Sequence, residues 1–109
     1  MKRILVFLLF FSSLNSFGEE VNEVCAKYKN TNKEYKVQAH ILSGTELNQK
    51  TKGYSYNSYS KYAVIFWGKD EASIIELDYP GTINSFGTDG KDQKGYKWEI
   101  SKSSAFCNN

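Results

Sequence analysis

Residues 61–79 read KYAVIFWGKDEASIIELDY, and they give the clearest structural prediction of the whole sequence. Residues 62–67 are apolar without interruption, which is typical of a central strand buried on both faces. Residues 68–71 then supply a glycine and three charged side chains for a turn. Apolar and polar side chains largely alternate over residues 72–79, as in a half-buried strand. The stretch therefore predicts an antiparallel β-hairpin.

Two segments on either side of this hairpin carry the same period of two. Residues 35–41 and 96–101 each alternate apolar side chains with polar ones, which predicts two further half-buried strands. Their apolar members are Tyr35, Val37, Ala39, Ile41, Tyr96, Trp98 and Ile100. Pro80 and Gly81 end the central hairpin, because proline cannot donate to a strand ladder and glycine adopts a positive φ without strain.

The remaining segments are less regular. Residues 19–29 place Val21, Val24, Cys25 and Tyr28 at the i, i+3, i+4 and i+7 spacing of one helical face, which predicts a short N-terminal helix. Residues 45–53 are polar and predict a loop, and residues 53–60 alternate imperfectly, as in an edge strand. Residues 86–95 are rich in glycine and predict a loop, with Asp-Gly as a tight turn before the last strand.

Together these segments predict a mainly β (α+β) fold. We expect a small antiparallel sheet, curled or sandwich-like, with one short N-terminal helix and a single disulfide.

The first eighteen residues predict a cleaved secretory signal. Lys2 and Arg3 precede eight apolar residues, 4–11, and Ser16 and Gly18 are the small residues expected before a cleavage site. The apolar run is far shorter than the roughly 20 residues that span a bilayer. Residues 19–109 are then a single small exported domain, located in the periplasm or secreted. The short signal and the preference for lysine over arginine favour a bacterial origin.

Charge and composition argue against nucleic acid and the membrane as partners. Without its signal the chain keeps 12 lysines against 12 acidic residues, and it loses Arg3, the only arginine. Nucleic-acid binders need a basic excess, and arginine is the preferred residue for phosphate and guanine recognition. We therefore expect no nucleic acid as partner and no stable membrane insertion after cleavage.

Cys25 and Cys107 predict one structural disulfide, because export leads to an oxidising compartment. A redox pair or a metal site fits less well. The two thiols form no CxxC motif, and His40, the only histidine, cannot complete a zinc shell alone. We expect no cofactor and no metal.

Three constellations could carry chemistry, and each has a simpler structural explanation. His40 lies on the polar face of a strand, without a serine or carboxylate near it in sequence that suggests a triad. Residues 89–95 resemble a calcium loop, but Lys91 stands where a ligand is required. Glu71, Glu76 and Asp78 could supply a carboxylate pair for sugar hydrolysis, although charges on a strand more often face water. The sequence therefore predicts no catalytic residues.

The segment 54–62 holds four tyrosines among serine and asparagine. Tyrosine provides a large amphipathic contact area at low entropic cost, and interfaces are enriched in it. Tyr54, Tyr56 and Tyr59 are accordingly the candidate binding residues. The alternative is an ordinary edge strand in which Tyr56 or Tyr62 packs on Trp67 and Trp98.

These observations favour a small exported, non-enzymatic binding protein. We expect it to act on a protein partner in the envelope or outside the cell, as an inhibitor, immunity or accessory factor. The alternative is an envelope protein that binds or cleaves glycan or peptidoglycan, with tyrosine or tryptophan stacked on the sugar rings.

Overall fold

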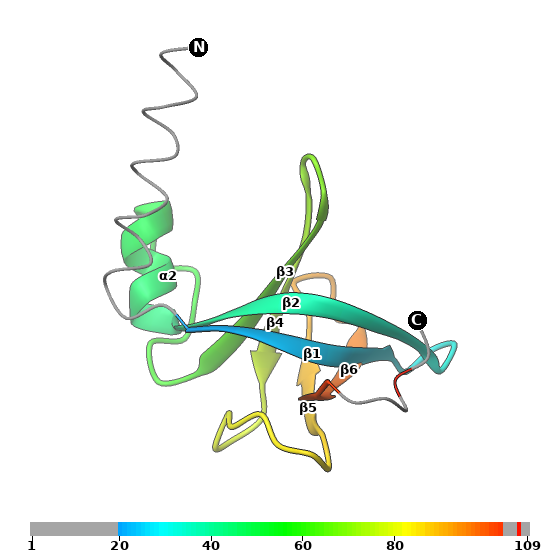
Figure 1. Ribbon diagram of the computed structural model, residues 1–109. Coiled ribbons are helices and arrows are strands. Elements are labelled where there is room, and N and C mark those ends of the chain that lie inside the picture. The colour runs from blue at the N-terminus through cyan, green and yellow to red at the C-terminus, as the bar shows by residue number, and fades with distance from the viewer. Residues whose placement is uncertain (1–19, 104–106, 108–109) are drawn as a thin grey trace.

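A computed structural model describes residues 20–103 and residue 107. The predicted signal, residues 1–18, lies outside the described residues. Within them the chain forms a closed antiparallel barrel in which each strand pairs with the next and the last pairs with the first (Figure 1). The elements are β1 (Glu20–Tyr28), β2 (Lys33–Ser43), α2 (Gly44–Thr51), β3 (Lys61–Gly68), β4 (Glu71–Leu77), β5 (Thr88–Lys91) and β6 (Lys97–Lys102). The mainly β prediction is confirmed, and the curled sheet closes completely.

The central hairpin is confirmed as β3 and β4, joined by Lys69 and Asp70. Asp70 adopts a left-handed φ of 64°, a conformation that aspartate tolerates better than most residues. The register shifts between Phe66 and Gly68, so Trp67 has no Cα partner on β4. Such bulges bend a strand and are common at barrel rims and beside functional sites.

The barrel interior is the main hydrophobic core. Side chains alternate along each strand, so every second residue points inward. The buried inward-facing cluster comprises Val24, Ala26, Ala39, Ile41, Ala63, Ile65, Ile75, Leu77, Trp98 and Ile100. The strands predicted around residues 35–41 and 96–101 are β2 and β6, and both supply this core.

The predicted N-terminal helix is wrong: the segment is strand β1, paired with β2 over its whole length and with β6 over residues 24–28. The helical spacing of the apolar residues coincides with a period of two in Val24, Ala26 and Tyr28, which face the core. Valine and cysteine have only moderate helix propensity, and hydrogen bonding to β2 on one edge and β6 on the other stabilises the strand.

The helix of the fold lies instead between β2 and β3, where residues 45–53 were expected to form a loop. A capping box begins α2. The Glu46 N–H donates to Ser43 Oγ at 3.1 Å, and the Ser43 N–H donates to Glu46 Oε1 at 2.9 Å. The helix covers the outside of β2 and β3 with a second buried cluster, Leu42, Leu47, Tyr62 and Val64. No helix in the described part of the chain is long and apolar enough to cross a membrane.

Residues 52–60, all described, form turns and bends, so the expected edge strand is absent there. The glycine-rich loop is also shorter than expected, since Asp89 and Gly90 belong to strand β5 and the tight turn follows at residues 92–96. Gly90 allows β5 to approach β4 closely: an added Cβ would lie 2.6 Å from the Glu76 carbonyl oxygen and 2.7 Å from Ile75 Cγ2.

The predicted disulfide is confirmed, with Cys25 and Cys107 joined at an S–S distance of 2.06 Å. Cys25 lies between the inward-facing Val24 and Ala26, so it occupies the outer side of β1.

Candidate functional site

One end of the barrel is an aromatic-lined opening, which we call the barrel mouth. Because consecutive strands alternate in direction, the short turns after β1, β3 and β5 meet at this end. The connection that contains α2 and the loop between β4 and β5 meet at the opposite end. The mouth is therefore framed by three tight hairpins.

The aromatic side chains reach the mouth because they occupy inward-facing positions at the mouth end of their strands. Tyr28 ends β1, Tyr35 lies near the start of β2, Trp67 lies near the end of β3, and Trp98 lies near the start of β6. Tyr96 adds a ring from the turn before β6 and is 46% exposed. One inward position in each of four strands thus contributes to a continuous aromatic layer above the aliphatic core.

Each ring contacts its neighbour around the mouth. Trp67 and Trp98 stack with centroids 5.7 Å apart, and Tyr35 meets Trp67 edge-on at 5.3 Å. Tyr28 packs against Trp98 at 5.0 Å and edge-on against Tyr96 at 5.8 Å. Offset and edge-on contacts are the favoured geometries for aromatic pairs, so the layer is well packed.

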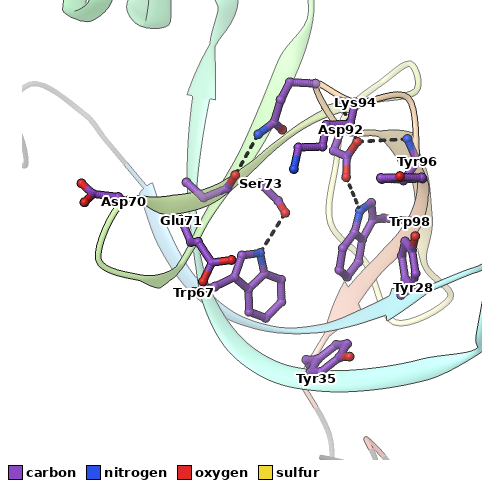
Figure 2. A pocket seen from close by; sticks show the side chains of 12 residues that line it. Tyr28, Tyr35, Trp67, Asp70, Glu71, Ser73, Asp92, Lys94, Tyr96 and Trp98 are labelled. Carbon is purple, nitrogen blue, oxygen red and sulfur yellow. Dashed lines mark hydrogen bonds between the residues drawn. The ribbon is translucent and has the colours of Figure 1, made fainter.

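These rings line a hollow of about 500 Å³ that opens to solvent. Figure 2 shows the rings below and to the right of the hollow, with acidic side chains on the left and charged side chains of the β5–β6 turn at the top. The lining comprises Tyr28, Tyr35, Trp67, Asp70, Glu71, Ala72, Ser73, Asp92, Gln93, Lys94, Tyr96 and Trp98. A mostly apolar concavity with a few convergent polar groups is the usual form of a ligand site.

Hydrogen bonds fix both indole rings. Trp67 Nε1 donates to Ser73 Oγ at 2.8 Å, and Trp98 Nε1 donates to Asp92 Oδ2 at 3.0 Å (Figure 2). The other oxygen of Asp92 accepts the backbone N–H groups of Lys94 and Tyr96 at 2.9 and 3.0 Å. Asp92 therefore orders the β5–β6 turn and holds a tryptophan of the mouth at the same time.

Gln93 closes a gap between β4 and β5. These strands pair directly only at Glu76–Lys91 and Leu77–Gly90, so the mouth-side half of β4 lacks a backbone partner on β5. The Gln93 side-chain amide replaces that partner: Oε1 accepts the Ile74 N–H and Nε2 donates to the Ala72 carbonyl, both at 2.8 Å.

The rim is acidic on balance. Asp70, Glu71 and Asp92 contribute three carboxylates to the lining, and Lys94 contributes one ammonium. A second ammonium, that of Lys33, lies 6.0 Å from the ring centroid of Tyr35. Carboxylates next to aromatic faces produce a negative potential, which favours cationic ligands.

The predicted binding tyrosines lie at the opposite end of the barrel and do not form one surface. Tyr54 and Tyr59 are each 97% exposed. Tyr56 instead packs edge-on against Tyr62, with centroids 5.4 Å apart, in the cluster under α2. Its backbone is held by Asn48, whose side chain accepts from the Tyr56 N–H and donates to its carbonyl oxygen. Tyr62 therefore packs outside the barrel and not on the tryptophans.

The other candidates are dispersed. His40 is half-buried and its ring meets that of Phe66 edge-on at 5.2 Å. Glu71 lies at the mouth, whereas Asp78 follows the far end of β4 and Glu76 accepts a hydrogen bond from Ser60 Oγ at 2.6 Å. The carboxylates do not converge on one cleft.

The calcium-like segment is used for structure. Asp89 forms an ion pair with Lys29 at 3.0 Å, and Asp92 binds the turn and Trp98 as described. Among the described residues, Cys25, Glu34 and Cys107 form the one grouping of three close enough for a metal, but its two sulfurs are joined in the disulfide.

Sequence reasoning missed the mouth. Its rings belong to four separate segments of the sequence, in which period two predicts only that Tyr35, Tyr96 and Trp98 face inward. Their convergence depends on barrel closure, which joins β1 to β6. A usable signal is that Trp67 directly precedes the turn predicted at residues 68–71 and Trp98 stands three positions after the loop predicted at residues 86–95.

The fold and the site define a small, disulfide-linked β-barrel with an aromatic, acid-rimmed hollow at one end. Comparisons with protein-family models, with curated proteins and with solved structures find no significant match for this chain.

Proposed function

We propose that the chain is an exported, non-enzymatic binding protein that takes up part of a protein partner at the barrel mouth. In this role it acts as an inhibitor, immunity or accessory factor. The observation that carries the proposal is the preformed hollow of about 500 Å³ walled by five aromatic side chains.

The rigidity of this wall supports a binding role. Ring contacts and two indole hydrogen bonds hold the aromatic layer in place before any ligand arrives. Binding energy is therefore not lost in ordering the site, which is the usual benefit of preorganisation. Buried tryptophan and tyrosine are also the residues that most often dominate interface energetics.

The mouth is a better candidate than the exposed tyrosines. Tyr54 and Tyr59 project almost fully into solvent, and a ligand would have to immobilise them on binding. Scattered exposed aromatic residues are common on protein surfaces and need no functional explanation. They provide instead the matched control for the mouth.

Partner capture from an envelope extract of the source cell tests the proposal. Tyr96→Ala removes a partly exposed wall of the mouth, while the double variant Tyr54→Ser, Tyr59→Ser removes two exposed tyrosines at the opposite end. We expect one specific protein to be retained by the wild type and the double variant, and lost with Tyr96→Ala. Its binding should also change the fluorescence of Trp67 and Trp98, the only tryptophans in the chain.

The opposite results are equally clear. Loss of capture only in the tyrosine double variant would move the site to the other end of the barrel. Co-sedimentation with peptidoglycan that Tyr96→Ala abolishes, with no protein captured, would replace the proposal by glycan binding.

A further inference from the structure

We infer that the group received at the barrel mouth is a cationic side chain of the partner, the ammonium of a lysine or the guanidinium of an arginine. The inference rests on the proposed function and goes further, because it assigns the ligand a charge and a shape.

The ring geometry points to a compact group enclosed from several sides. Tyr28 and Tyr96 stand at 83° to each other, and Tyr35 and Trp67 at 70°. Rings at such angles to each other do not offer one continuous flat face of the kind on which a base stacks. Several aromatic rings around one hollow attract ammonium groups because each ring face carries the negative part of a quadrupole.

The charges at the rim favour the same ligand. Glu71, the first residue of β4, stands beside Trp67 across the hollow from the β5–β6 turn, and Asp70 precedes it in the β3–β4 turn with its carboxylate directed outward (Figure 2); both residues are exposed. Asp92 adds a third carboxylate whose charge is balanced by no ion pair among the described contacts, since its three partners are N–H groups. A cation entering the hollow would meet this negative potential at close range.

One ammonium group of the chain already lies beside the aromatic layer. Lys33 holds its Nζ 6.0 Å from the ring centroid of Tyr35, within the range of a cation–π contact. Lys94 lines the hollow and provides the opposing charge at the rim. The charge of Lys94 should therefore weaken the binding of a cation, so replacing Lys94 by a neutral residue tests whether the ligand is positively charged.

The experiment titrates small probes and follows the fluorescence of the two tryptophans together with NMR shifts of their indole N–H groups. The cationic probes are Nα-acetyl-lysine amide and Nα-acetyl-arginine amide, and the neutral control of similar shape is Nα-acetyl-norleucine amide. A chitin oligosaccharide serves as the glycan probe. We expect both cations to bind at the mouth, the norleucine derivative to bind about tenfold more weakly, and added salt to weaken the cations alone.

Three single-charge variants make the test quantitative. Lys94→Gln should tighten cation binding and Glu71→Gln should weaken it, each about three- to tenfold, as expected for one unit charge at the rim. Asp78→Asn, an exposed carboxylate beyond the far end of β4, should change nothing. Indole N–H shifts that are the same in each ligand-free variant as in the ligand-free wild type would confirm that the variant keeps the aromatic layer.

Failure of this inference is distinguishable from failure of the proposed function. Equal binding of the norleucine derivative, weaker binding in Lys94→Gln, or no shift with either cation overturns the inference. Each of these results leaves the proposed function standing as long as partner capture still depends on Tyr96. A response to the chitin oligosaccharide alone overturns both.

Discussion

At the scale of single residues, the side chains that stabilise the fold also position the rings of the mouth. Asp92 orders a turn through two backbone N–H groups and fixes the indole of Trp98, so a carboxylate that sequence spacing placed in a calcium-like loop supports the mouth. Ser73 accepts the indole N–H of Trp67 and so fixes the second tryptophan of the mouth; Ser73 is itself buried. Both indole donors are thereby satisfied, as buried polar groups must be.

Tyr62 gives a prediction for alkaline pH. Burial raises the pKa of its phenol above the usual 10.0, and the Glu76 carboxylate acts in the same direction, while the hydrogen bond from the Asn57 N–H acts against them. The folded state therefore favours the neutral phenol. Its contribution to stability is complete below pH 10 and is lost as the pH rises through the raised pKa.

We expect the free energy of unfolding to fall more steeply above pH 10 in the wild type than in Tyr62→Phe, as measured by urea denaturation at a series of pH values. At neutral pH the same variant should lose about 1 kcal/mol, the net contribution of one hydrogen bond. Tyr59→Phe, altered at an exposed phenol, is the matched control. Parallel slopes for wild type and Tyr62→Phe would contradict the assignment.

At the scale of elements, Gln93 acts as a substitute strand partner for β4. Gln93→Ala should expose the Ile74 N–H and speed its amide hydrogen exchange, with a loss of stability of about 1 kcal/mol because water can replace the lost bonds. Gln93→Glu keeps the acceptor for Ile74 and loses the donor for Ala72, so it should largely retain the protection. Unchanged exchange at Ile74 in Gln93→Ala would show that the amide bridge has no such role.

The capping box at Ser43 and Glu46 sets where α2 begins. Ser43→Ala should lower the free energy of unfolding by about 1 kcal/mol, because the first turn of the helix loses a side-chain acceptor. Ser43→Thr keeps that acceptor, and Ser58→Ala changes an exposed serine outside the box. Equal denaturation midpoints for Ser43→Ala and Ser58→Ala would contradict the prediction.

Much of the strand pattern was predictable because β2, β4 and β6 are long enough to show period two and β3 contains an uninterrupted apolar run. The exceptions have identifiable causes. In β1 the helical and strand periods coincide, and only pairing with β2 and β6 decides between them. Strand β5 has four residues, one of them glycine, which is too short for periodicity to register. The signal for α2 was present as Ser43-x-x-Glu46, inside a segment whose polarity suggested a loop.

At the scale of the whole molecule, barrel closure creates the site. Tyr28 and Trp98 are neighbours because β1 pairs with β6, at opposite ends of the described chain. No local pattern encodes that pairing, so the aromatic members of the mouth could be predicted to face inward but not to meet. The acidic rim arises likewise, from turns that closure brings around one opening.

The disulfide acts on this closed barrel from outside. It joins residues 82 positions apart, and in the chain-entropy model a loop of that length contributes about 4–5 kcal/mol by restricting the unfolded chain. The backbone pairing of β1 with β6 over residues 24–28 closes the barrel independently of the sulfurs. The bridge is therefore expected to stabilise the fold without shaping the mouth.

The double variant Cys25→Ser, Cys107→Ser separates these two effects. It should remain folded, melt at a clearly lower temperature and keep the ring contacts around Trp67 and Trp98, since Cys25 lies on the outer side of β1, away from the aromatic layer. Thermal unfolding followed by circular dichroism measures the first effect, and the indole N–H shifts measure the second. The wild type in reductant should match the variant. An unchanged melting temperature would show that the bridge contributes no stability, and displaced indole shifts would show that it does shape the mouth.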